Sequence, residues 1–301
     1  MYLLAVNVTS ADNRLIMNWL ESSDIMAAIG EFLAEDIGRG DITTRATLSP
    51  DLRGQGRFLA KESLVICGLD IAEAVFFHLD PDCGEIETTY NDGDEIKAGT
   101  VIGTLKAYAD VLLTGERVAL NLFQRMCGIA TLTRSYVKAI EGTGAQIVDT
   151  RKTTPGLRML EKYAVTIGGG RNHRMGLDDG VLIKDNHIAL AGGITEAVTA
   201  AKNQVGHLHK IEVEIMNWAQ LREAIEAGAE IILLDNQTPE EAAKLTQMAR
   251  DMNPHVLIEV SGGMDLDRVR SFADAGVDLI SVGRLTHSAR AVDISFKIQA
   301  V

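Results

Sequence analysis

Positively charged residues concentrate in one part of this acidic chain. Residues 151–187 contain seven Lys and Arg but only four Asp and Glu, whereas the whole chain of 301 residues has a formal net charge of −13. The cations Arg151, Lys152, Arg174 and Lys184, together with His173, are of the types that bind carboxylates and phosphates. Their clustering predicts a pocket for a small, multiply charged anion.

Most of the candidate residues lie at the ends of predicted strands. Short β-branched runs recur at 146–150, 180–185, 210–215, 230–235, 255–261 and 278–283. The residues at or just after their ends are Thr150, Arg151, Lys152, Lys184, Glu214, Asp235, Ser261, Gly262, Gly263, Gly283 and Arg284. In parallel α/β barrels the catalytic groups come from the carboxyl ends of the strands. We therefore expect these side chains to meet, with the two late glycine loops forming a cradle for phosphate.

Helix-like stretches alternate with these strands. Residues 217–228 begin with Asn and end with Gly, and residues 239–252 follow Thr238 with Pro239 in the first helical position. Such punctuation is typical of helix ends. Six or seven βαβ units favour a closed or nearly closed parallel barrel. No G-x-G-x-x-G motif follows a strand, which argues against a dinucleotide-binding fold.

The first half of the chain has a different pattern. Residues 24–36 predict an amphipathic helix, residues 53–68 and 86–108 predict strands with Gly-rich turns, and residues 112–140 have helical periodicity. The turn at 91–107 is similar to that of biotinyl and lipoyl carrier domains, but it lacks their Met-Lys-Met sequence. A β-rich packing domain is the favoured interpretation.

Composition excludes several classes of protein. Apolar residues make up 46% and charged residues 24% of the chain, as in a globular protein. The negative charge disfavours nucleic-acid and membrane partners, and no apolar run approaches the ~20 residues of a membrane span. The N-terminal segment lacks the features of a secretory signal. Three cysteines without a C-x-x-C pair indicate a reducing compartment. A cytoplasmic location is expected.

Each candidate also has a structural interpretation. Arg151 and Lys152 could be solvated loop charges, and His173 could be a core or surface histidine. Glu214 and Asp235 could be rim carboxylates paired with Lys184. Arg117, in GERVALN, could be an ordinary charge on a helix.

Several long motifs, in order, resemble those of the quinolinate phosphoribosyltransferase family, whose members are type II phosphoribosyltransferases. They are EDIGRGDITT (35–44), ERVALNLFQRMCGIAT (116–131), DTRKTTPGLR (149–158), GGGRNHRMGLDDGVLIKDNHI (168–188), EVE (212–214), LLDN (233–236), EVSGG (259–263) and ISVGRLTHS (280–288). The resemblance runs from about residue 24 to the C-terminus. It implies an N-terminal α/β sandwich-like domain over 1–116, rejoined by 288–301, and a seven-stranded parallel α/β barrel over 117–287.

The resemblance also implies an activity. In this family quinolinate and phosphoribosyl pyrophosphate react, with Mg²⁺, to give nicotinate mononucleotide, pyrophosphate and CO₂, a pentosyl transfer that serves NAD biosynthesis. Members are dimers or dimer-built oligomers with the site at the subunit boundary. The carboxylated pyridine suits bidentate guanidinium contacts.

Roles for individual residues follow from the same resemblance. Arg151, Arg174 and His173 would hold quinolinate, with Arg117 reaching in from the partner subunit, and Lys152 and Lys184 would neutralise carboxylate and phosphate charge. Glu214 and Asp235 would bind the ribose hydroxyls or the metal and stabilise positive charge on the sugar. Positions matching the family's substrate site are Thr150, Ser261, Gly262, Gly263, Val282, Gly283 and Arg284. The catalytic set would be Lys152, Glu214 and Asp235.

Two departures and two alternatives accompany this assignment. Residues 284 and 290 are Arg here, where relatives often have a small residue and an apolar residue or Pro, respectively; residues 1–22 receive no role. One alternative is a paralogous transferase acting on another anionic nitrogen heterocycle, which would need fewer cations. The other is a non-catalytic barrel that binds a phosphorylated ligand, for which Glu214→Ala would change nothing.

Overall fold

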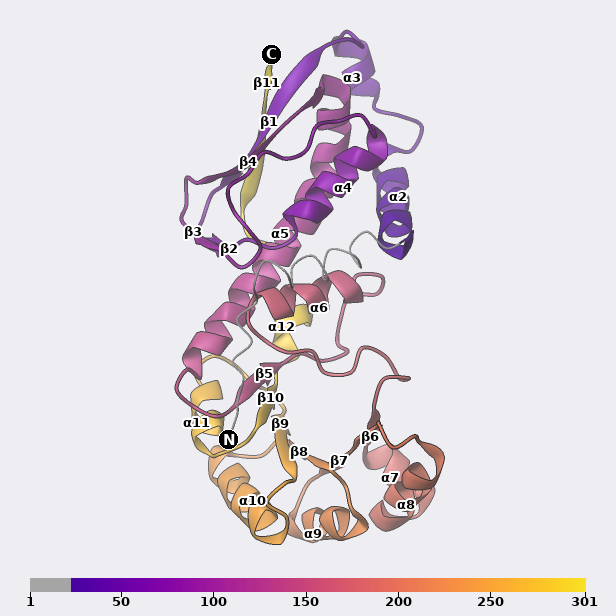
Figure 1. Ribbon diagram of the computed structural model, residues 1–301, viewed down its shortest axis with the longest axis vertical. Helices are drawn as coiled ribbons and strands as arrows, with labels where there is room; N and C mark the ends of the chain where they lie inside the picture. The colour runs from indigo at the N-terminus through magenta and orange to yellow at the C-terminus, as the bar shows by residue number, and fades with distance from the viewer. Residues whose placement is uncertain (1–22) are drawn as a thin grey trace. The chain divides into compact units, whose positions relative to one another are not determined.

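The chain forms two units in the computed structural model, which describes residues 23–301 (Figure 1). One unit comprises the described residues up to Gly128 together with Ala291–Val301, and the other comprises Ile129–Arg290. Helix α5 (Ala109–Ala139) begins in the first unit and ends in the second, so the sequence-based boundary at residue 117 lies inside it. Residues 1–22, assigned above to the N-terminal domain, lie outside the described residues.

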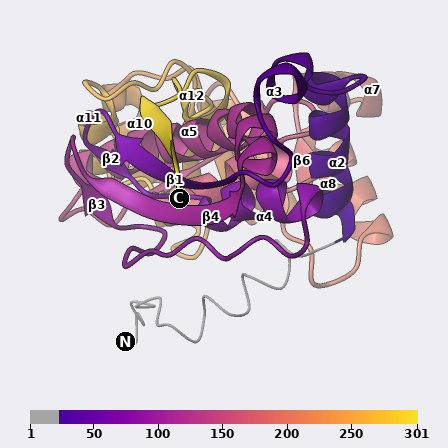
Figure 2. The same cartoon turned by 90° about the horizontal axis from the view of Figure 1, so that it is seen from above.

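The first unit is a mixed α/β structure. Its main sheet has the antiparallel order β11–β1–β4, formed by Ile294–Ala300, Arg53–Ala60 and Val101–Tyr108. β2 (Leu64–Val65) and β3 (Glu95–Ile96) form a second, two-stranded sheet. The other elements are helices α2 (Ser23–Ile37), α3 (Ile42–Thr47), α4 (Leu69–Leu79) and the first part of α5. The C-terminal strand therefore completes a sheet begun near residue 53 (Figure 2).

Aromatic side chains hold α4 and α5 against this sheet. Phe58 of β1 lies 6.4 Å from Phe76 of α4, 5.6 Å from Phe123 of α5 and 4.5 Å from Phe296 of β11, measured between ring centroids. Phe58, Phe76 and Phe123 are fully buried. Gly56 lies beneath the Phe296 ring, where an added Cβ would overlap it. The strand pattern of residues 53–68 thus produces a packed face, as the sequence predicted.

The second unit is a parallel α/β structure. Its sheet has the order β5–β10–β9–β8–β7–β6, and all its strand pairs are parallel. The strands are β5 (Gln146–Val148), β6 (Val181–Ile183), β7 (Ile211–Ile215), β8 (Ile231–Asp235), β9 (Leu257–Ser261) and β10 (Leu279–Ser281). All six fall within the predicted runs, and the α/β class is confirmed.

The expected count of seven strands is not confirmed in residues 23–301. Where a seventh strand would lie, Arg171 forms a single parallel bridge with Val148. Its N–H donates to Ile147 O, and its carbonyl oxygen accepts the N–H of Asp149. Three glycines, Gly168–Gly170, precede Arg171, and turns follow it. The extended segment is therefore too short to count as a strand.

Helices follow the strands of the second unit. They are α6 (Arg158–Ile167), α7 (Asp185–Ala191), α8 (Ile194–Gln204), α9 (Trp218–Ala227), α10 (Pro239–Met252), α11 (Val269–Asp274) and α12 (Arg284–His287). The predicted caps are present: Asn217 accepts the N–H of Gln220, and Thr238 forms a capping box with Glu241. Because helix α11 begins only at Val269, it is shorter than the helix expected over 264–276.

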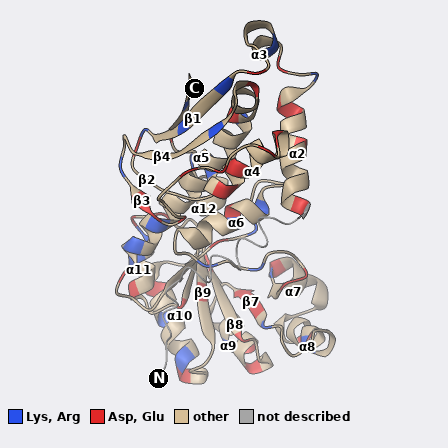
Figure 3. Cartoon of the chain, turned by 45° about the horizontal axis from the view of Figure 1, so that its top comes forward, with Lys and Arg blue, Asp and Glu red and all other residues tan. Residues whose placement is uncertain are grey.

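The surface charge agrees with the acidic composition. Asp and Glu lie along α2 and α4 (Figure 3). On α2, Asp24, Glu31 and Glu35 are exposed. In the part of the chain that the structure describes, no helix is both long enough and apolar enough to cross a membrane.

Candidate active site

A cavity of about 300 Å³ lies at the carboxyl ends of the parallel strands. Its lining residues are Thr150, Arg151, Lys152, His173, Arg174, Leu182, Lys184, Leu233, Glu259, Ser261 and Ser281. Seven of these belong to the sequence-predicted site, and they come from four separate segments of the chain. The scattered cations are therefore brought to one place.

Strand register explains why these side chains share the interior. Glu214 pairs with Leu233, and Leu233 pairs with Glu259 on the next strand. Because alternate residues of a strand face the same side, Asp235 and Ser261 lie on the same face one step further along. Asp235 and Ser261 are also paired in register. The barrel interior is thus polar at the carboxyl ends of β7, β8 and β9.

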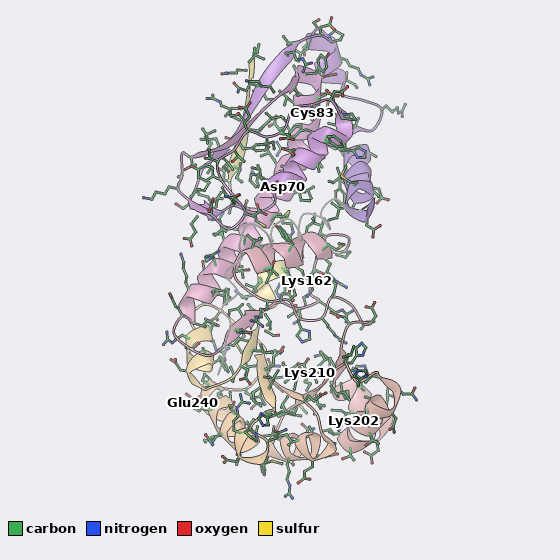
Figure 4. All side chains as sticks on the ribbon, in the orientation of Figure 1. Asp70, Cys83, Lys162, Lys202, Lys210 and Glu240 are labelled. Carbon is green, nitrogen blue, oxygen red and sulfur yellow. The ribbon has the colours of Figure 1, made fainter. Side chains whose placement is uncertain are left out.

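A buried ion pair positions the segment that carries His173 and Arg174. Lys162 of α6, labelled in Figure 4, has no exposed side-chain surface and lies 2.5 Å from Asp149 Oδ1. Lys162 Nζ also donates to His173 O at 2.9 Å, and His173 N–H donates to Asp149 Oδ1 at 2.8 Å. Burial raises the pKa of Asp149 and lowers that of Lys162, although their pairing opposes both shifts. The ion pair thus links helix α6 to the end of β5 and to the segment that carries His173 and Arg174.

Two arginines bring positive charge to the cavity. Arg174 donates to Gly180 O at 2.9 Å, which orients its guanidinium group. Burial, and then the charge of Arg151, lower the pKa of Arg174. Arg151 Nε is buried and finds no hydrogen-bond partner among residues 23–301. A buried donor without a partner is costly, so this site fits an anionic ligand that would accept from it.

The two acidic residues at the rim have different partners. Glu214 forms an ion pair with Lys184. The sequence left open such a structural pairing with Lys184 for both Glu214 and Asp235. Asp235 instead accepts from Ser261 Oγ at 2.8 Å and from Asn236 Nδ2 at 2.6 Å. Both carboxylates lie beside groups that line the cavity, although neither lines it directly.

The donor types of Glu214 and Asp235 fit a magnesium ion. Mg²⁺ is bound through one or two carboxylates while water and substrate phosphate oxygens complete its coordination. Two carboxylates next to a cation-lined cavity for phosphate meet that requirement without a dedicated protein cage.

The glycine loops leave room for a ligand's oxygens. Gly262 has a φ of 98°, which favours glycine, and an added Cβ would overlap the Asn236 side chain. Gly263 also has a positive φ, of 59°. An added Cβ on Gly283 would lie 3.2 Å from Lys152 and from the His287 ring, so the loop brings these two basic side chains together. His287 was not among the predicted residues.

Three other predicted residues lie outside this cavity lining. Val282 is buried, and its N–H donates to Val148 O of the neighbouring strand β5. This backbone N–H is therefore already bonded within the protein. Arg284 is exposed at the start of α12. Arg117 lies on α5 in the first unit with an exposed side chain, and its place at a subunit boundary stays a prediction.

Sequence reasoning missed a buried polar cluster beneath the cavity. His173 Nε2 lies 3.1 Å from Glu212 Oε2 and 3.7 Å from Glu259 Oε1, and Ser281 Oγ donates to Glu259. The available signal was an acidic residue in the interior of each of two strands, Glu212 in IEVEI and Glu259 in LIEVS. A buried charge of this kind calls for a partner.

The tautomer of His173 excludes this cluster as a simple metal centre. The ligand atoms of His173, Glu212 and Glu259 lie within 4.8 Å of one another. However, His173 Nδ1 accepts the N–H of Arg174 at 2.7 Å, so the ring proton is on Nε2. A metal-bound histidine would instead carry its proton on the nitrogen away from the metal.

The same geometry limits the charge of His173. Burial lowers its pKa, but the hydrogen bond with Glu212 and the charges of Glu259 and Glu212 raise it overall. A second proton would have to occupy Nδ1, where the Arg174 N–H already points. In this conformation Nε2 therefore carries a proton and donates to Glu212, and a second proton on Nδ1 would require the Arg174 N–H to turn away.

Fold and site together define a class: an α/β-barrel protein that can bind a small polyanion at the carboxyl ends of its strands. Residues 41–127 match the profile of the quinolinate phosphoribosyl transferase N-terminal domain, and residues 129–297 match that of the C-terminal domain. The chain belongs to the quinolinate phosphoribosyl transferase family.

Individual relatives cover nearly the whole chain. A protein of Synechocystis described as a probable nicotinate-nucleotide pyrophosphorylase (carboxylating) is 46% identical over 268 residues, which are 89% of this chain and 90% of that protein. Its counterpart in Bacillus subtilis is 45% identical over 285 residues, 94% and 95% of the two chains. The solved nicotinate-nucleotide pyrophosphorylase of Francisella tularensis has a TM-score of 0.86 at 40% identity, covering 93% of this chain and 98% of that one.

Proposed function

We propose that this protein transfers the phosphoribosyl group of phosphoribosyl pyrophosphate to quinolinate and releases CO₂, forming nicotinate mononucleotide and pyrophosphate for NAD biosynthesis. The observation that carries the proposal is the cavity in which Arg151, Lys152, Arg174 and Lys184 converge at the carboxyl ends of the strands. The buried, unsatisfied Nε of Arg151 supports an anionic ligand there. The names of the curated relatives supply the reaction.

The two carboxylates of quinolinate would bind on the side of the cavity that Arg151, Arg174, Lys152 and Lys184 line. Arg151 and Arg174 would each bind carboxylate through two N–H groups, and Lys152 and Lys184 would balance the remaining charge. The ring of His173 lines the cavity, but its nitrogens bond to Glu212 and Arg174. His173 would therefore form a wall of the ligand site and hold the Arg174 backbone in place.

The sugar and its phosphate occupy the other side in this proposal. Ribose–pyrophosphate cleavage develops positive charge on the sugar, and the carboxylates of Glu214 and Asp235 would stabilise it. Lys184, released from Glu214, would be free to contact the ligand. The 5-phosphate would accept from Ser261 Oγ and from the backbone of the positions Gly262, Gly263 and Gly283. The pyridine nitrogen is the nucleophile, so no side-chain nucleophile is needed.

Glu214 and Asp235 would also hold Mg²⁺ together with the pyrophosphate oxygens. When bound, the ion would neutralise charge on the leaving pyrophosphate. The remaining work falls to the chain's own cations and glycine loops, which orient both substrates in line.

We further propose a homodimer, or a dimer-built oligomer, in the cytoplasm, with Arg117 of the partner subunit completing the quinolinate site. What supports it is the exposed side chain of Arg117 on α5, which lies outside the cavity lining of its own chain. Mixing Arg117→Ala protein with Arg151→Ala protein tests the shared site. Recovery of part of the activity in mixed dimers is expected, and no recovery despite subunit exchange would contradict it.

The decisive test of the activity uses quinolinate labelled in its carboxyl groups. Incubation with phosphoribosyl pyrophosphate and Mg²⁺ should release labelled CO₂ and one pyrophosphate per CO₂. Nicotinate as the acceptor should give no nucleotide. Absence of both products would refute the proposed function. Glu214→Ala should abolish turnover, whereas the non-catalytic alternative requires that it change nothing.

A further inference from the structure

Glu259 is a carboxyl group that the proposed roles leave unused. It lies in the middle of β9, its side chain is 3% exposed, and it lines the same cavity as Arg151, Arg174 and Lys184. A buried carboxyl group facing a ligand site for anions opposes binding if it is charged. Its position therefore requires either a neutral form or a chemical role.

Burial and the neighbouring Glu212 favour the protonated form of Glu259. Burial and the charge of Glu212 on β7 raise its pKa to about 7, while His173, the Ser281 hydroxyl on β10 and Lys184 at the end of β6 act in the opposite direction. Arg151, Lys152 and Arg174 line the cavity in front of it. Near neutral pH the carboxyl group is thus divided between its two forms, which suits a group that gives up and regains a proton.

Glu212 supplies a second, independent observation. Its Oε2 accepts from His173 Nε2 at 3.1 Å, but its Oε1 is buried without a hydrogen-bond partner in the described part of the chain. Oxygen atoms of Glu212 and Glu259 lie within 4.8 Å of each other and of His173 Nε2. The His173 ring donates one hydrogen bond to Glu212, and the free Glu212 oxygen still needs a donor nearby. A protonated Glu259 would bring the missing proton into the cluster, and Glu259 is the carboxyl group with the raised pKa.

A second cavity connects this cluster with the opposite end of the barrel. It measures about 570 Å³ and lies at the amino ends of the strands, where Gln146, Ile231 and Leu257 line it with Lys210 (labelled in Figure 4). His173, Arg174 and Glu259 line both cavities. Glu259 therefore lies between the reaction site and a separate open space that can supply protons.

We propose that Glu259 is the acid that delivers a proton to the pyridine carbon from which CO₂ departs. This rests on the proposed function. The bond between ring carbon and carboxylate breaks, CO₂ leaves, and the electron pair stays on the ring carbon. The Glu259 O–H bond then breaks as the new C–H bond forms, and the resulting carboxylate takes a proton from water in the second cavity.

Glu259→Gln is the main test, because it keeps the size and the hydrogen bonds of the side chain but provides no acid. Pyrophosphate release and CO₂ release are timed separately in a single turnover, with Glu240→Gln on the exposed surface of α10 as the matched control (Figure 4). The variant should release pyrophosphate within threefold of the parent rate. Formation of nicotinate mononucleotide should fall about 100-fold or more, as for loss of a general acid.

The pH profile provides a readout that a structural role would not change. In the parent protein the rate of nicotinate mononucleotide formation should fall about tenfold per pH unit above neutrality, since only protonated Glu259 can deliver the proton. Ser281→Ala removes a hydrogen bond that lowers the pKa of Glu259, so this alkaline limb should move to higher pH. The variant covers the case in which Glu259→Gln fails to fold.

The outcomes separate this inference from the proposed function. If the parent protein releases neither product, the proposed function fails. If the parent is active and Glu259→Gln makes nicotinate mononucleotide at the parent rate with the same pH profile, Glu259 is not the acid. An alkaline limb that stays in place in Ser281→Ala would likewise contradict the inference.

Discussion

Removing one member of the buried pair Asp149–Lys162 should destabilise the protein strongly. In Lys162→Met the volume of the side chain is nearly kept, but Asp149 stays buried and its carboxylate loses the 2.5 Å contact. Both side chains have no exposed surface, so water cannot replace the partner. Breaking such a pair costs about 3–5 kcal/mol. For a domain of this size, each kcal/mol lowers Tm by about 2–4 °C, so Tm should fall by about 6–20 °C.

The assay is thermal and urea unfolding at pH 7, followed by far-UV circular dichroism. Arg222→Ala, which breaks the exposed pair with Glu226, serves as the control and should leave Tm unchanged. Adding Asp149→Asn to Lys162→Met removes the unpaired charge and should restore at least half of the loss. A loss below about 1 kcal/mol in Lys162→Met would refute the argument, because the charge would then be solvated despite its burial.

Three further predictions concern the site. Arg151→Ala should abolish turnover without lowering Tm by more than about 2 °C, because the buried Nε that it removes has no hydrogen-bond partner among residues 23–301; unchanged kinetics would remove Arg151 from the site. Gly262→Ala should raise KM for phosphoribosyl pyrophosphate much more than KM for quinolinate, because the methyl group would collide with the Asn236 side chain and displace the loop of Gly262 and Gly263; equal effects on both KM values would count against the cradle. For Glu259, a folded-state pKa of about 7 means that the native protein holds a proton that the unfolded chain has lost above pH ~4.5, so its contribution to stability should fall as pH rises from 5 to 7. The difference in unfolding free energy between Glu259→Gln and the parent should therefore grow in favour of the variant over this range, and a difference independent of pH would contradict the assignment.

The sequence predicts the parts of this protein that depend on local pattern. β-branched runs with Gly-rich or acidic ends gave all six strands of the second unit, and Asn217 and Thr238 mark two helix starts correctly. Because parallel strands place their carboxyl ends at one edge, the approximate meeting of Arg151, Lys184 and Ser261 also followed from pattern alone.

Features that depend on tertiary packing were not predictable in this way. Lys162 and Asp149 are thirteen residues apart, on a helix and at a strand end, and nothing in the local sequence distinguishes Lys162 from an exposed helical lysine. The single bridge at Arg171 in place of a seventh strand reflects how briefly the chain stays extended there. The sequence suggested His173 as a ligand for carboxylate, but only the structure shows that Arg174 and Glu212 occupy its nitrogens.

The central claim is that converging arginines hold the two carboxylates of quinolinate at the barrel mouth. A crystal structure of the protein with quinolinate tests it most directly. The account predicts the pyridine in the cavity at the carboxyl ends of the strands, with the guanidinium groups of Arg151 and Arg174 within hydrogen-bond distance of its carboxylates. Quinolinate bound elsewhere, or bound there without contact to either arginine, would contradict it.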